Sequence, residues 1–147
     1  MLFMDIEVRV DIAADRAAVW QSLAAVEDWP RWSKSVTTVK RLEPGPLVLG
    51  ASARIKQPGI PAMVWKVTEL AEQESFTWEA RAVGVVTTAD HVLEDRDGGV
   101  TLVLTVRQRG FLAGLVGRLF AERNRRYVEM EAAGHEACSE QAWKSTA

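Results

Sequence analysis

Cysteine is almost absent from this chain of 147 residues, and its scarcity rules out two kinds of stabilising cross-link. Cys138 is the only cysteine, so the chain can form neither an intrachain disulfide nor a zinc site built on several cysteines. An excess of positive charge is also lacking, because 18 Lys and Arg face 20 Asp and Glu, for a formal net charge of -2. This balance gives no electrostatic footprint for nucleic acid, and we expect no nucleic-acid partner.

Signals for export, metal binding and common catalytic sites are missing as well. The apolar start, residues 1–4, is interrupted by Asp5 and Glu7, which predicts neither a signal peptide nor a membrane span. The sequence has no Gly-x-Ser-x-Gly elbow, no phosphate-binding glycine loop followed by Lys and no His-Glu-x-x-His. His135 and Cys138 could share a metal but have no obvious third ligand, so we interpret them as a helix-surface histidine and a packed thiol. We expect a cytoplasmic protein without metal, cofactor or membrane insertion.

Apolar residues at every second position predict strands over most of the first two thirds of the chain. The clearest alternation runs from residue 4 to residue 12 and predicts a strand with one buried face. Two short helices follow, with Asp15 as the cap of the first, Asp28 as the cap of the second and Pro30 in its first turn. Six further strands, joined mostly by Gly- or Pro-containing turns, are predicted at residues 36–42, 51–57, 63–70, 76–81, 85–93 and 100–107.

The last third of the chain, residues 110–143, reads as one long helix. One side of this helix carries arginines and glutamates, such as Arg118 and Glu122, which are spaced to form ion pairs on a solvated face, and the other side is apolar. A rod of about 45 Å exceeds any predicted strand and must bury its apolar side against the sheet. That apolar stripe consists of Leu112, Val116, Leu119, Tyr127, Met130, Gly134 and Ala137.

This order of elements predicts a fold class. Short connections make sequential strands antiparallel neighbours, so we expect an α+β domain spanning residues 1–147 with a seven-stranded antiparallel sheet and helices on one face. No repeat, linker or low-complexity segment suggests a second domain.

Local motifs occur throughout this pattern and carry a family resemblance. They are Val19-Trp20, Trp29-Pro30-Arg31-Trp32, Gly45-Pro46-Leu47-Val48-Leu49-Gly50, Lys56-Gln57-Pro58-Gly59, Val64-Trp65, Phe76-Thr77-Trp78, His91 and Arg125-Arg126-Tyr127. Together with the element order, they resemble the polyketide cyclase/dehydrase-like bacterial branch of the START / Bet v 1-like (SRPBCC) superfamily. The resemblance implies a helix-grip fold, in which a curved sheet wraps a long C-terminal helix around an interior cavity. It also implies binding of hydrophobic small molecules, which some relatives cyclise or aromatise, whereas others carry lipids.

Candidate site residues follow from the faces on which they lie. His91 shares a mostly apolar strand face, so we expect it to point inward, where it could exchange a proton with a ligand, contact it, or serve structure. Trp65 and Trp78 fall on inward faces of adjacent strands, as a pocket wall or as ordinary core. Trp29 and Trp32 are expected near the cavity mouth.

Three residues of the long helix complete the candidate set, which places its first half against the cavity. Leu119 would contribute apolar surface. Arg123 lies in the apolar stripe and requires a partner, either a ligand anion or, as we favour, a protein acid. Tyr127 could offer its hydroxyl to the cavity or be plain core.

Three functions remain open. The favoured one is a binding protein that encloses a hydrophobic, lipid- or polyketide-like molecule between sheet and helix. The second is a cyclase or aromatase in which His91 is the acid/base group and positioning lowers most of the barrier. The third is an interaction module without ligand, which could form a homodimer.

Overall fold

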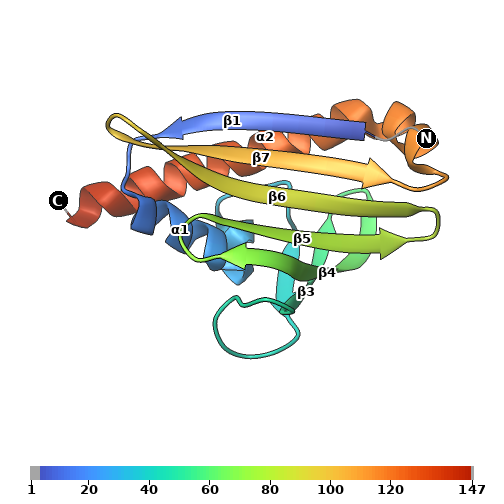
Figure 1. The fold of residues 1–147 in the computed structure, drawn as a ribbon, viewed down its shortest axis with the longest axis horizontal. Helices are drawn as coiled ribbons and strands as arrows, with labels where there is room; N and C mark the ends of the chain where they lie inside the picture. The colour runs from blue at the N-terminus through green and yellow to red at the C-terminus, as the bar shows by residue number, and fades with distance from the viewer. Residues whose placement is uncertain (1–3, 147) are drawn as a thin grey trace.

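The structure, a computed structural model, describes residues 4–146, so the interpretation of residues 1–3 lies outside the described part of the chain. Within that range one sheet and three helices follow the predicted order (Figure 1). The elements are β1 (Met4–Ile12), α1 (Arg16–Ala24), the 3-10 helix η1 (Val26–Arg31), β2 (Thr38–Arg41), β3 (Ser52–Gln57), β4 (Ile60–Ala71), β5 (Ser75–Ala82), β6 (Val85–Arg96), β7 (Gly99–Arg109) and α2 (Ala113–Thr146).

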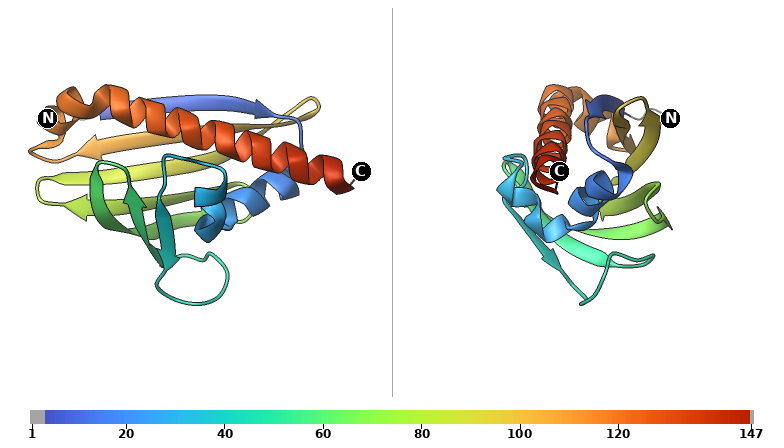
Figure 2. Two further views of the ribbon diagram at one scale, coloured as in Figure 1. Left: turned by 180° about the vertical axis from the view of Figure 1, so that it is seen from behind. Right: turned by 90° about the vertical axis from the view of Figure 1, so that its left-hand side faces the viewer.

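The seven strands form one antiparallel sheet in the order β1-β7-β6-β5-β4-β3-β2. Irregular register between β3 and β4, after Ile55, and between β4 and β5, after Val67, bends the sheet at these points. The curved sheet wraps around α2, which crosses its concave side, and α1 and η1 lie on that side too (Figure 2). This is the predicted α+β helix-grip arrangement, so the fold class is confirmed.

Of the two helix caps predicted near the start of the chain, one is correct and one is not. Asp15 caps α1 as predicted, because its Oδ1 accepts from the backbone N–H of Ala18 at 2.9 Å. The second helix is a 3-10 turn with Pro30 inside it, and its N-cap is Ala25, without a side-chain hydrogen bond. The predicted cap, Asp28, is therefore wrong: it lies within the turn, where its own N–H donates to Ala25 O at 3.0 Å.

The buried side of α2 differs from the predicted apolar stripe. Ala113, Val128, Ala132, His135 and Ser139 are buried, whereas the stripe residue Leu119 is 63% exposed. Of the other stripe residues, Gly134 is buried and Ala137 is exposed, while Leu112, Val116, Tyr127 and Met130 are partly buried. The prediction is therefore right in part: a search for apolar residues at helical spacing misses the two polar residues on the buried side. The predicted solvated face is confirmed in the first half of the helix, where Arg118, Glu122, Arg125 and Glu129 are exposed.

One glycine of α2 packs closely against Trp32, the residue that follows η1. Gly134 lies directly under the backbone of Trp32, and a Cβ at this position would collide with the carbonyl oxygen of Trp32.

No helix within residues 4–146 is long and apolar enough to span a membrane.

Candidate functional site

A cavity of about 280 Å³ lies between the concave face of the sheet and α2. The lining side chains from β6, Val85, Thr87, Ala89 and His91, follow every second position of the strand, because alternate residues point to the same face. Exposure of the lining rises from His91, at 2%, to Val83 in the β5–β6 turn, at 84%. The cavity therefore has a buried inner end at His91 and opens near that turn. Its wall is mainly apolar and aromatic and also includes Trp29, Val36, Ile55, Gln57, Ile60, Met63, Trp65, Trp78, Ala82, Val106, Gln108, Val116, Arg123, Asn124, Tyr127, Val128 and Glu131.

Aromatic rings surround the inner end. Trp78 lies with its ring centroid 5.9 Å from that of Trp65 and 5.4 Å from that of Trp29. The imidazole of His91 stacks on Phe76 at 4.1 Å with an interplanar angle of 8°. Trp65 and Trp78 thus point inward as expected, but Trp29, only 3% exposed, packs beside His91 at the inner end rather than at the mouth.

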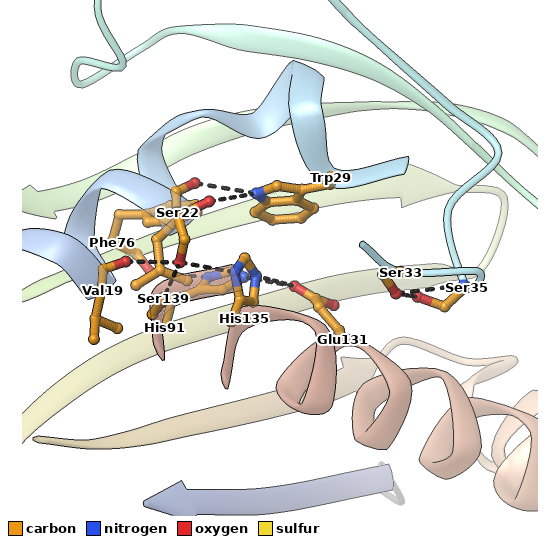
Figure 3. Close-up of polar contacts among 11 residues, drawn as sticks. Val19, Ser22, Trp29, Ser33, Ser35, Phe76, His91, Glu131, His135 and Ser139 are labelled. Carbon is orange, nitrogen blue, oxygen red and sulfur yellow. Dashed lines mark hydrogen bonds and ion pairs between the residues drawn. The ribbon is translucent and has the colours of Figure 1, made fainter. Parts of the chain in front are cut away.

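His91 is fixed through both ring nitrogens. Its Nδ1 lies 3.2 Å from the carbonyl oxygen of Phe76, and its Nε2 lies 3.3 Å from Oε1 of Glu131 (Figure 3). A backbone carbonyl can only accept, so Nδ1 carries a proton, and the second contact requires a proton between Nε2 and the carboxyl group. The ring lies against Phe76 and beside Trp29 and Trp78, which hold its orientation.

Glu131 is the central acid of this cluster, and sequence reasoning missed it. Burial raises the pKa of its carboxyl, but contacts with His135 and His91 outweigh burial and lower the pKa from 4.5 to about 2. Glu131 is therefore ionised near neutral pH and forms an ion pair with His91. In the sequence it looked like one more glutamate of a charged helix; its spacing four residues before His135 was the available signal.

His135 closes the network on the side of α1. Its Nδ1 lies 3.1 Å from Oγ of Ser22, which donates to Val19 O at 2.8 Å and accepts from Ser139 at 3.2 Å. Burial lowers the pKa of His135, even though Glu131 raises it, and so keeps the ring neutral.

The surface position predicted for His135 is wrong, because the residue is fully buried. Its Nε2 lies 3.8 Å from Glu131 and has no hydrogen-bond partner among the described residues. The thiol of Cys138 is partly buried, and burial, together with Asp28, raises its pKa. Within residues 4–146 no three His, Cys, Asp or Glu side chains are placed to hold a metal ion.

Two residues of α2 fasten the β3–β4 turn at the mouth of the cavity. The hydroxyl of Tyr127 donates to Pro58 O at 2.7 Å, and Nη1 of Arg123 donates to Gly59 O at 3.3 Å. Arg123 also lies over the ring of Phe120 at 4.3 Å, while its Nε is buried without a partner among the described residues. The favoured protein acid for Arg123 is thus replaced by a backbone carbonyl and an aromatic face.

The structure brings five of the six predicted site residues together around the cavity: Trp65, Trp78, His91, Arg123 and Tyr127. Leu119 lies outside the lining, because the helix is rotated relative to the predicted stripe, and its side chain points to solvent. The expectation that the whole first half of α2 faces the cavity is corrected accordingly.

The architecture, with its cavity between a curved sheet and a C-terminal helix, is the helix-grip architecture of Bet v 1-like proteins. The sequence model of the family described as "Polyketide cyclase / dehydrase and lipid transport" matches residues 4–135, and the chain belongs to this family. A search of curated proteins found no match.

Solved structures share the fold at low sequence identity. The hypothetical protein jhp0584 from Helicobacter pylori is 17% identical with a TM-score of 0.78, covering 94% of this chain and 88% of that one. The di-domain ARO/CYC StfQ from the steffimycin biosynthetic pathway is 12% identical with a TM-score of 0.73, covering 99% of this chain and 52% of that one. Ara h 8.0201 is also 12% identical, with a TM-score of 0.65 and coverage of 98% and 99%. At these identities the likeness concerns the fold.

Proposed function

We propose that this protein binds an apolar small molecule in the cavity between its sheet and α2. The observation that carries the proposal is the combination of a mainly aromatic and aliphatic wall with a few polar groups gathered at the inner end. Family membership supports it, since the family description includes lipid transport. A volume of about 280 Å³ lies just below the usual range for small-molecule sites, which begins at about 300 Å³, and favours a compact ligand. An open cavity counts against a ligand-free interaction module.

Native mass spectrometry of the protein purified from its own source tests this proposal. We expect a co-purified apolar compound of one mass, released on denaturation. Ala89→Phe is the matching cavity-filling variant, because Ala89 lines the cavity and a phenyl ring would occupy the ligand volume. Ala133→Phe places the same ring on an exposed position of α2 and serves as the control. Retention of the compound by Ala89→Phe, or its equal loss from both variants, would contradict binding in this cavity.

A second candidate is a cyclase or aromatase that acts in the same cavity. Its support is the ionised Glu131, which lines the cavity and is held by two histidines. In an intramolecular aldol condensation, Glu131 would take the proton from the carbon that attacks a ligand carbonyl and return it to the alkoxide that forms. Removal of a second proton from that carbon would then form the C=C bond as the hydroxyl group leaves, so that one water is lost. His91 would then act by holding Glu131, since both of its own nitrogens are engaged.

The enzyme hypothesis differs from plain binding in the mass of the bound compound. Glu131→Gln would trap a precursor that is heavier by one water than the compound bound to the wild type. Identical masses in both proteins would leave binding as the function and remove catalysis.

A further inference from the structure

The histidine at the inner end of the cavity has no donor left for a ligand. Both ring nitrogens of His91 face acceptors within the protein, Phe76 O and Glu131 Oε1. Its side chain is only 3% exposed, against 17% for Glu131. The polar surface that a ligand meets at this end is therefore the carboxylate and not the imidazole.

An ionised carboxylate accepts hydrogen bonds and cannot donate them. The pKa of Glu131, lowered to about 2, keeps it in this form near neutral pH. A ligand hydroxyl placed here gains a charge-assisted hydrogen bond. A ligand carboxylate placed here would lose its hydration and face a like charge, and neither loss is compensated.

A second polar position lies in the wall between the inner end and the mouth. Gln108 is 8% exposed, and its amide bonds to Thr87 Oγ1 at 3.3 Å, while Oε1 has no partner among the described residues. A threonine hydroxyl can bond to either end of the amide, so one amide atom stays unpaired in both orientations. Thr87 precedes His91 by four residues on β6, about 13 Å along the strand. A ligand polar group would remove the penalty of this buried, unpaired atom.

We infer that the cavity selects apolar ligands that carry a hydroxyl group at their inner end, hydrogen-bonded to Glu131, and discriminates against ligands that carry a carboxylate there. The inference rests on the proposed function, because it concerns the ligand of the same cavity. A further hydroxyl or carbonyl at the outer end of the ligand would meet Gln108.

Three probes of similar shape separate these contributions: naphthol, naphthoate and naphthalene, titrated calorimetrically into the protein near neutral pH. Naphthol is neutral and donates a hydrogen bond, naphthoate is an anion, and naphthalene has no polar group. We expect naphthol to bind about tenfold or more tightly than either of the others, the size of a hydrogen bond to a buried charge.

Glu131→Gln then assigns the selectivity to one residue. The ratio of naphthoate to naphthol dissociation constants should fall about tenfold, because the amide can donate to a carboxylate, while naphthalene binding is retained. Glu129→Gln makes the same charge change on the exposed side of α2 and should leave the ratio as in the wild type.

The possible results separate the inference from the proposed function. Equal binding of all three probes would overturn the selection for a hydroxyl while leaving an apolar binding cavity in place. The inference would also be overturned if naphthoate bound as tightly as naphthol, if Glu131→Gln left naphthoate binding unchanged, and if Arg123→Gln abolished it. The anion would then lie at the mouth of the cavity. Binding of none of the probes would overturn the proposed function and, with it, the inference.

Discussion

Oε1 of Glu131 lies 3.3 Å from Nε2 of His91, and this contact joins α2 to the middle of the sheet. The two residues are 40 positions apart in the sequence, and each is held by further groups of its own. His91 is anchored to Phe76 O, and Glu131 is approached by His135. The inner end of the cavity is therefore set by a buried ion pair whose partners come from different layers of the fold.

Removing the carboxyl of Glu131 should destabilise the protein according to what replaces it. Glu131→Ala leaves a buried imidazole without a partner, and we expect the free energy of unfolding to fall by about 3 kcal/mol. Glu131→Gln should lower it by about 1 kcal/mol only, because the amide can donate to Nε2 of a neutral His91. Urea denaturation monitored by tryptophan fluorescence measures both. The control is Glu129→Ala, on the exposed side of α2, which should change the free energy of unfolding by less than about 0.5 kcal/mol. Equal losses of stability for Glu131→Ala and Glu131→Gln would argue against the ion pair.

Stability should decrease in acid in two steps. The folded-state pKa of Glu131 is depressed from 4.5 to about 2, so its contribution is present above pH 4.5 and is lost as the pH falls toward 2. A difference of about 2.5 pKa units corresponds to about 3 kcal/mol. Burial also lowers the pKa of His135 from 6.5, so the unfolded state binds this proton first and stability already declines below about pH 6.5.

Urea midpoints measured from neutral pH to pH 3 resolve the two contributions. Glu131→Gln should remove most of the decline below pH 5, and His135→Gln should remove the decline that begins near pH 6.5. A wild-type protein with constant stability between pH 7 and pH 4 would contradict the assignment of these buried groups.

The sequence predicted the strands and the fold well because their signal is local. Alternation along β1 and β7 places apolar residues on the concave face, and Ile6, Leu102 and Leu104 are buried accordingly. The inward direction of His91 followed from the same period of two. Register between strands and the curvature of the sheet arise from pairing over long distances, and no local pattern contains them.

The site on α2 was predicted less well, for a physical reason. Glu131, His135 and Ser139 lie on the inner side of the helix because they satisfy one another and His91, a compensation that only the three-dimensional arrangement reveals. A hydrophobic pattern treats these residues as solvent-facing, so it rotated the helix and brought Leu119 into the cavity. His91 was found because its neighbours on the strand are apolar, whereas the partner that orients it was not.

Gly134 should be intolerant of even one added methyl group. Alanine is favoured over glycine within a helix by about 1 kcal/mol, so helix propensity alone predicts that Gly134→Ala is stabilising. The added Cβ would instead collide with the carbonyl oxygen of Trp32 and also lie 3.0 Å from its Cδ1, so η1 or α2 must shift. We expect a net loss of about 2 kcal/mol in the free energy of unfolding. At the exposed neighbour, Ala133→Gly should lower the free energy of unfolding by about 1 kcal/mol through helix propensity alone. Stabilisation by Gly134→Ala would contradict the close contact with Trp32.

The hydroxyl of Tyr127 should control how fast ligands exchange with the cavity. It donates to Pro58 O at 2.7 Å and, with Arg123, fastens the β3–β4 turn against α2 beside the cavity mouth. Tyr127→Phe keeps the ring in the cavity wall and removes only this hydrogen bond, whose net contribution is about 1 kcal/mol. If the turn must part from the helix when a ligand passes, association and dissociation rates of naphthol should both rise, by roughly fivefold. The dissociation constant should change less than either rate, since the bound state retains its other contacts.

Stopped-flow measurement of tryptophan quenching gives both rates. Arg125→Lys, at an exposed position two residues before Tyr127, is the control. An effect of Tyr127→Phe on the dissociation rate alone would assign the hydroxyl to ligand binding rather than to the mouth.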